Sequence, residues 1–128
     1  MTAQTDTGCV VEAYGRRVVV ARSGGDRISC KVRGRSLEAV AGDQVRVSLE
    51  ASDDEWTVIE RVPRRNVLCR SDSRGRTESI AANLDQLGVV VAARPACDPF
   101  IVDRYLAGAS YAGIATLLRS TRRIAVIG

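Results

Sequence analysis

Alternating apolar and polar residues, grouped into short runs between residues 7 and 62, constrain the fold more than any other feature of this chain. In the run RISCKVRGR, the apolar Ile28, Cys30 and Val32 alternate with polar residues, which is typical of a strand with one buried face. The sequence SGGD at 23–26 is a turn with two glycines and indicates a hairpin. The strands that we expect are residues 7–15, 16–22, 27–35, 44–50 and 56–62.

A break separates the third expected strand from the fourth. Residues 36–43 read as a single helical turn or a loop, closed by Gly42. A mainly β chain with this order of strands is typical of a five-stranded Greek-key barrel of the OB type. An SH3-like barrel is the alternative, but the break favours the OB fold. We therefore expect a polar tail over 1–6 and an OB-fold domain over 7–62.

The pattern changes after residue 62. Residues 63–79 are polar and rich in arginine, which predicts a linker. The run LGVVVAA at 87–93 is apolar on both faces, as a strand covered by helices would be, and it is too short to cross a bilayer.

A helix is expected next. Asp98 can serve as its N-cap, Pro99 is suited to its first position, and Gly113 ends it. A second strand should follow, in 115–118 or in 123–127. One such unit cannot bury both of its own faces, so 80–128 reads as an incomplete α/β segment.

The basic residues supply the main functional signal. The net charge is +4, and only one of the 19 basic residues is a lysine. Codon bias in a GC-rich genome explains that ratio, but not where the arginines are placed. They cluster on the first three expected strands and again over 61–76, where phosphate contact is a ready explanation and a solvated surface is the alternative. The candidate RNA-binding residues are Arg16, Arg17, Lys31, Arg33, Arg35, Arg64, Arg65, Arg70, Arg74 and Arg76.

Aromatic residues for stacking on bases are few. Tyr14 and Trp56 are the candidates in the expected barrel. Recognition of the nucleic-acid backbone and shape is therefore favoured over the reading of a base sequence.

The sequence gives no support for catalysis, nucleotide binding or metal binding. The chain has no histidine, and its four cysteines contain no C-x-x-C pair, so we assign no zinc ligands. Its single lysine, Lys31, is followed by Val32, so neither a P-loop nor an N-K-x-D motif is present. Cys30 and Cys69 have no recognisable activating partner, and we expect buried, reduced thiols. The polar N-terminus has no signal-peptide pattern, so we expect a cytoplasmic protein.

Several short motifs, in order, resemble one known family. They are C-x-x-R-G-R at 30–35, A-G-D-Q-V at 41–45, P-R-R-N-V-L-C-R at 63–70, A-A-N-L-D-Q at 81–86 and D-R-Y-L at 103–106. Over about residues 7–114 the chain resembles the N-terminal part of the circularly permuted, small-subunit-dependent GTPases of the RsgA/YjeQ/EngC type. The resemblance implies an OB barrel that docks on the small ribosomal subunit and contacts its rRNA during late maturation of that subunit. It also implies a permuted GTPase domain that begins near Ile80 and binds GTP with Mg, followed by a zinc-binding region.

The chain departs from that family after Ile114. The family continues into N-K-x-D, whereas this chain has ATLLRSTRRIAVIG at 115–128. We therefore expect 80–128 to be a truncated start of the GTPase domain, without GTP or zinc ligands. The expected partners are the small subunit and its rRNA, with no membrane and no DNA, for a monomeric chain. A free-standing OB adaptor similar to an initiation factor and a non-functional remnant are the alternatives.

We predict that the isolated chain does not hydrolyse GTP, because the lysines of both nucleotide motifs are absent. Phosphate release with and without small ribosomal subunits measures this directly. Micromolar affinity for GTP in calorimetry would contradict the prediction.

Overall fold

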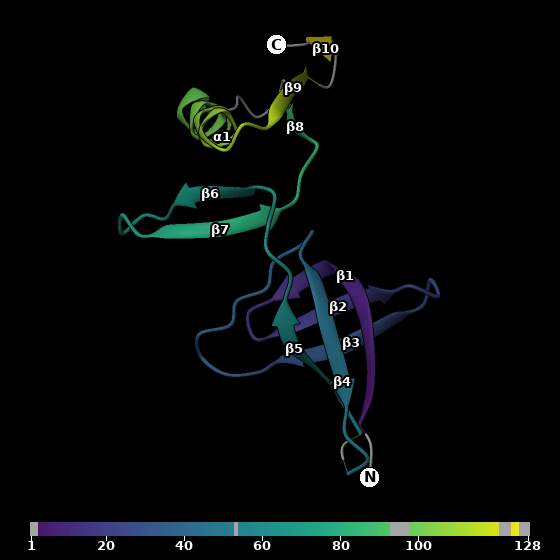
Figure 1. Cartoon of the computed structure of the whole chain (residues 1–128). Helices are drawn as coiled ribbons and strands as arrows, with labels where there is room; N and C mark the ends of the chain where they lie inside the picture. Colours follow the sequence, from purple (N-terminus) through teal and green to yellow (C-terminus); the bar gives the residue numbers. More distant parts are fainter. Residues whose placement is uncertain (1–2, 53, 93–97, 121–123, 126–128) are drawn as a thin grey trace. The chain divides into compact units, whose positions relative to one another are not determined.

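The computed structural model describes residues 3–52, 54–92, 98–120 and 124–125. The chain divides into two compact units, Met1–Arg65 and Asn66–Gly128, and each is described by itself (Figure 1).

The first unit is a closed five-stranded barrel. Around the barrel the strand order is β1-β2-β3-β5-β4, with β1 and β4 also paired. The β3–β5 pair is parallel and the other pairs are antiparallel. This arrangement confirms the mainly β class and the OB-type barrel. Its strands are β1 (Gln4–Tyr14), β2 (Arg17–Arg22), β3 (Arg27–Val32), β4 (Gln44–Leu49) and β5 (Trp56–Arg61).

Valine side chains fill the barrel, because β-branched residues suit a pleated surface and this chain has few aromatic residues. The alternation predicted for β3 is observed, with Cys30 and Val32 buried and Lys31 exposed. β1 has an irregularity between Val10 and Glu12, where its register with β2 shifts, as at the bulges that bend strands around barrels. The buried core residues are Val10, Val18, Val20, Cys30, Val32, Ala39, Val45, Val47 and Val58.

The prediction of a tail over residues 1–6 is wrong for residues 4–6, which belong to a strand. β1 begins at Gln4, and residues 4–6 pair with Leu49, Ser48 and Val47 of β4. Backbone pairing holds these residues in the sheet although their side chains are polar, so the apolar pattern does not reveal the start of the strand.

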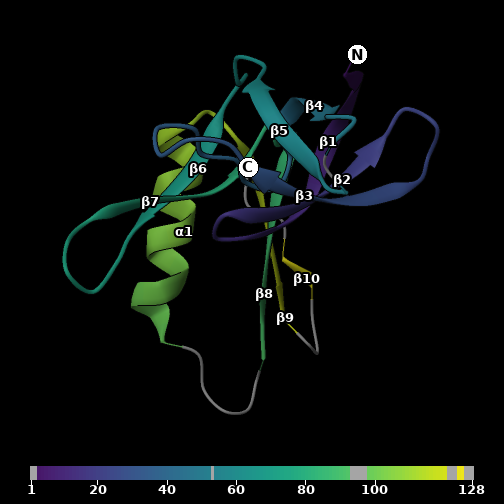
Figure 2. The same ribbon diagram turned by 90° about the horizontal axis from the view of Figure 1, so that it is seen from below.

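The second unit contains a β-hairpin and a β–α–β unit (Figure 2). In the β–α–β unit, β8 and β9 pair in parallel and α1 connects them, while β10 adds an antiparallel edge. This agrees with the α/β segment expected after the barrel. The elements are β6 (Val67–Ser71), β7 (Thr77–Ala82), β8 (Gln86–Val91), α1 (Pro99–Tyr111), β9 (Ala115–Ser120) and β10 (Ile124–Ala125).

The linker expected over 63–79 is wrong for most of that stretch. Residues 67–71 form β6 and residues 77–79 belong to β7, which pair in antiparallel register. Leu68 is buried between this hairpin and α1, together with Ala109 and Ile114. A single buried leucine among many arginines is too weak a signal to predict a strand.

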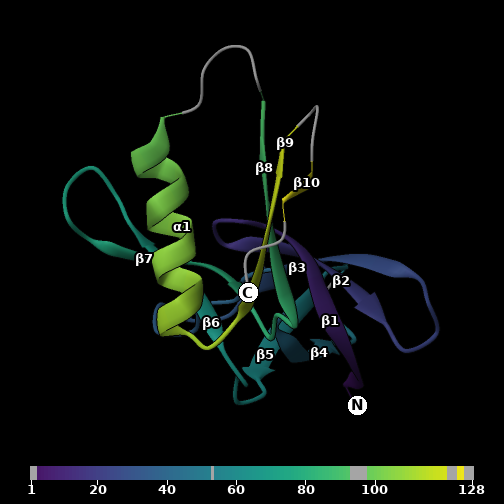
Figure 3. The same cartoon turned by 90° about the horizontal axis from the view of Figure 1, so that it is seen from above.

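α1 has the predicted ends. Asp98 accepts a hydrogen bond from the backbone N–H of Phe100 at 3.0 Å, Pro99 occupies the first turn, and Gly113 has a φ of 73°. Figure 3 shows α1 running alongside β8 and β9. The apolar side chains of α1 are only partly buried, since Ala109 is inaccessible and Ile101 is 48% exposed. No helix in the described part of the chain is long and apolar enough to span a membrane.

We predict that Gly8→Ala destabilises the barrel by about 1–3 kcal/mol, the usual cost of overpacking. A Cβ atom at Gly8 would lie 2.5 Å from the carbonyl oxygen of Ala21 and 2.5 Å from Cγ1 of Val20. Urea unfolding followed by the fluorescence of Trp56, the only tryptophan, reports on this unit. Gly24→Ala is the control, because a Cβ atom there would meet only Oδ1 of Asp26, at 3.7 Å. Equal midpoints for the two variants would contradict the prediction.

Candidate nucleic-acid interface

The outer side of β3 carries exposed basic side chains. Arg17 on β2 lies opposite Lys31, and Lys31 lies opposite Thr57 on β5. Lys31 and Arg33 line a shallow pocket of about 180 Å³ together with Ser48, Glu50, Thr57 and Ile59.

The predicted RNA-binding residues on this side of the barrel differ in whether their side chains already form an ion pair. Arg17 forms an ion pair with Glu55. Lys31, Arg33 and Arg35 are exposed, and within the described residues their side chains have no hydrogen bond or ion pair. Arg17, Lys31, Arg33 and Arg35 are called the barrel patch below. Its unpaired cations can approach an anion without first breaking an internal contact.

Arg16 has a structural contact instead. Its Nη1 donates to the carbonyl oxygen of Leu37 at 2.8 Å, and its Nη2 donates to that of Val32 at 3.0 Å. These bonds tie the β1–β2 turn to the segment after β3. Arg16 would lose them on binding phosphate, so we leave it out of the barrel patch.

The two aromatic candidates differ in accessibility. The guanidinium carbon of Arg22 lies 5.0 Å from the ring centroid of Trp56, a cation–π distance. Nε of Arg22 donates to Oδ2 of Asp26 at 3.0 Å, which holds the guanidinium group over the ring. The face of Trp56 beneath Arg22 is therefore already covered. Tyr14 is 67% exposed and lies opposite Arg17 at the end of the β1–β2 hairpin. Of the two rings, Tyr14 is the one that is open for stacking on a base.

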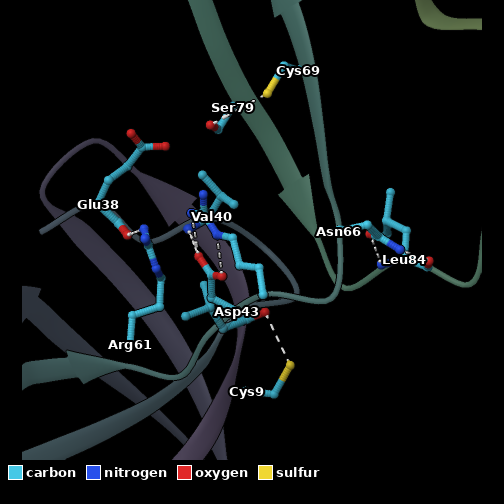
Figure 4. A network of polar contacts seen from close by, with 11 residues as sticks. Cys9, Glu38, Val40, Asp43, Arg61, Asn66, Cys69, Ser79 and Leu84 are labelled. Carbon is cyan, nitrogen blue, oxygen red and sulfur yellow. Dashed lines mark hydrogen bonds and ion pairs between the residues drawn. The ribbon is translucent and has the colours of Figure 1, made fainter. Parts of the chain in front are cut away.

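Arg64 forms a buried ion pair with Asp43. Its Nε and Nη2 donate to the two carboxylate oxygens of Asp43 at 2.8 and 2.9 Å, the bidentate geometry of strong pairs. The Asp43 side chain is fully inaccessible, and that of Arg64 is 16% exposed. Oδ2 of Asp43 also accepts from the backbone N–H of Val40 at 2.8 Å (Figure 4). This arrangement holds the barrel together, and it leaves Arg64 poorly placed to bind RNA.

Of the two arginines nearest to Arg64 in this cluster, Arg61 makes a contact within the barrel and Arg65 is exposed. Nη1 of Arg61 donates to the carbonyl oxygen of Glu38 at 2.7 Å (Figure 4). Arg65 is exposed. Arg61 and Arg64, two members of the cluster predicted over 61–76, are therefore engaged in contacts within the barrel unit.

The hairpin of the second unit presents three of the predicted arginines. Oδ1 of Asp72 accepts from the backbone N–H groups of Arg74 and Arg76 at 2.8 and 2.9 Å, and Gly75 has a φ of 78°. This turn leaves the side chains of Arg74 and Arg76 exposed at its tip, with Arg76 at 3.5 Å from Asp72. Arg70 donates to the hydroxyl of Tyr105 at 2.8 Å and lies 3.7 Å from Glu78. Arg70, Arg74 and Arg76 are called the hairpin patch below.

The described part of the chain offers little for catalysis. Burial and, to a smaller extent, the nearby carboxylate of Glu55 raise the pKa of the Cys30 thiol to about 11, so Cys30 is protonated at neutral pH. Among the described residues, no three His, Cys, Asp or Glu side chains come together as a metal site.

Comparisons with known proteins agree with this architecture. The RsgA GTPase family model matches residues 61–122. The small ribosomal subunit biogenesis GTPase RsgA of Variovorax paradoxus is 46% identical over 88 residues, which cover 69% of this chain and 27% of that protein. RsgA of Pseudomonas aeruginosa is 38% identical over 112 residues, covering 88% of this chain and 33% of that protein.

Solved structures show the same fold. YjeQ from Thermotoga maritima is similar with a TM-score of 0.60 and 25% identity, over 91% of this chain and 41% of YjeQ. YloQ, a circularly permuted GTPase, has a TM-score of 0.58 at 22% identity, over 91% of this chain and 40% of YloQ, which supports the fold alone.

An OB barrel followed by a hairpin and a β–α–β unit thus defines the class of protein, one that shares the fold of part of YjeQ. The chain belongs to the RsgA/YjeQ family of ribosome biogenesis GTPases, which confirms the resemblance inferred from its motifs. It spans about a third of the length of the curated relatives that it matches.

We predict that Arg64→Met lowers the free energy of unfolding of the barrel by about 3–5 kcal/mol, because the carboxylate of Asp43 is left buried without its partner. Urea unfolding read by Trp56 fluorescence measures the change. The matched control is Arg46→Met, which removes an exposed pair with Glu60 and should cost no more than about 1 kcal/mol. Similar costs for the two variants would mean that the buried pair does not stabilise the barrel.

Proposed function

We propose that this chain is the ribosome-docking part of a factor for late maturation of the small ribosomal subunit, and that it binds the rRNA of that subunit. The observation that carries the proposal is the barrel patch, where Lys31, Arg33 and Arg35 are exposed without a partner in the described chain. Relatives that share this barrel are named small ribosomal subunit biogenesis GTPases, which supports rRNA as the polyanion.

The proposed contacts are to phosphates rather than base edges. Point charges on the outside of a barrel hold the nucleic-acid backbone, and Tyr14 is the one exposed ring beside the barrel patch. Arg74 and Arg76 at the hairpin tip supply further phosphate contacts. Arg65 is exposed and stays a candidate, whereas Arg16 and Arg64 serve the barrel.

The proposal assigns no GTP hydrolysis to these residues. GTP, Mg and zinc belong to the family as a whole, and the sequence offers no ligand for them in this chain. We propose that the chain acts in the cytoplasm as a monomer on RNA, and not on DNA.

We predict that Arg33→Gln weakens binding to small-subunit rRNA and makes the salt slope of log affinity shallower by about 0.7–0.9, the value for one phosphate contact. Fluorescence anisotropy over a series of salt concentrations measures both quantities. The control is Arg46→Gln, which makes the same chemical change at an arginine paired with Glu60.

Two outcomes would contradict this function. Equal losses in the two variants would indicate a response to net charge alone. Affinity of the parent chain that does not change with salt would exclude docking through phosphates.

A further inference from the structure

A mostly apolar groove of about 770 Å³ lies within the second unit, between β6 and one face of α1. The lining residues of α1 are spaced three and four apart, so they form one stripe of the helix. The lining residues that matter here are Cys69, Arg70 and Thr77 from the hairpin, and Arg104, Gly108 and Tyr111 from α1.

A different face of α1 is already used for packing. Tyr105 and Ala109 join Leu68 and Ile114 in the core of this unit. At Gly108 the helix approaches β6 so closely that a Cβ atom would lie 2.8 Å from the carbonyl oxygen of Cys69. The bottom of the groove is therefore formed by backbone atoms at Gly108 and Cys69, and longer side chains form its sides.

The charged side chains among the described lining residues are all positive. They are Arg70 and Arg104, and none of the described lining residues is a carboxylate. Arg70 is oriented by the hydroxyl of Tyr105 and by Glu78, which lies outside the lining. The side chain of Arg104 is exposed, and within the described residues it has no hydrogen bond or ion pair. The groove is complementary to an anion that also has an apolar surface.

Tyr111 indicates which class of anionic ligand suits the groove. Its side chain is 97% exposed, although it stands on a well-formed helix at the edge of an apolar groove. An exposed aromatic ring and two guanidinium groups in one groove can stack an unpaired base and hold its phosphates. The hydroxyls of Ser71 and Thr77 in the lining can bond to base edges or to ribose.

We propose that this groove binds single-stranded RNA, with a base stacked on Tyr111 and the adjoining phosphates on Arg70 and Arg104. The proposal rests on the function proposed above and adds a second, separate contact to it. An acidic peptide would satisfy the two arginines, but it makes less use of the exposed ring and the hydroxyls.

Cys69 provides a local probe, because its thiol lines the groove and is partly exposed. The full chain is treated with N-ethylmaleimide, with and without a short unstructured RNA, and alkylation of each cysteine is followed by peptide mass spectrometry. We expect RNA to slow alkylation of Cys69 and to leave Cys9, in the barrel, unchanged.

Matched variants identify the contacts. Tyr111→Ala should raise the RNA concentration that half-protects Cys69 by about fivefold, the lower end of the effect of losing one stacked base, whereas Tyr111→Phe should keep protection. Arg104→Gln should weaken protection, and Arg119→Gln, at an exposed position on β9 outside the groove, should not. Far-UV circular dichroism of Tyr111→Ala and Arg104→Gln checks that these variants keep the fold of the parent chain.

The outcomes separate this inference from the proposed function. RNA that binds in anisotropy without protecting Cys69 overturns the groove site and leaves the rRNA-docking function standing. No binding of RNA by any measure overturns both. Stronger protection by an acidic peptide than by RNA of equal charge would overturn the RNA assignment in favour of a protein partner.

Discussion

The buried pair between Asp43 and Arg64 is the interaction on which the barrel unit most depends. The turn that carries Asp43 is also fixed to β1, since Gly42 donates to the carbonyl oxygen of Val10 and Val10 donates to that of Asp43, each at 2.8 Å. Arg64 lies 21 residues further along the chain, after the last strand of the barrel. The inaccessible carboxylate of Asp43 thus joins the β3–β4 connection to the segment after β5, and the backbone of the same turn joins it to β1. Burial of an unpaired charge would be prohibitive, so the arginine is required by the carboxylate.

The arginines of this chain therefore have two kinds of role that composition cannot separate. Arg16, Arg61 and Arg64 donate to the carbonyl oxygens of Leu37 and Glu38 and to the carboxylate of Asp43, all in the irregular segment 33–43. Arg33 and Arg74 have no such acceptor for their side chains in the described chain. A guanidinium group suits both roles because its donors fit a carbonyl and a phosphate equally well. Only tertiary contacts decide between them.

The sequence predicts the barrel well because its signal is local. Alternation in β3 and β4, and the break between them, follow from which face of each strand is buried. The start of β1 and the β6–β7 hairpin are not predictable in this way, since they depend on backbone pairing and on one distant contact of Leu68 with α1. The exposed Lys31 and Arg33 were predicted as site residues, whereas the groove along α1 was missed. Its only sequence signal is the helical spacing of Arg104, Gly108 and Tyr111.

The two proposed RNA contacts differ in physical character, and this difference determines how binding should depend on salt. The barrel patch is a set of exposed positive charges, so its contribution comes mainly from counterion release and falls steeply as salt rises. The groove adds an apolar floor and the exposed ring of Tyr111, whose stacking energy is little affected by ions. At low salt the barrel patch should control affinity, and at high salt the remaining affinity should come from the groove. A chain with both contacts can hold a phosphate backbone loosely and an unpaired base more selectively.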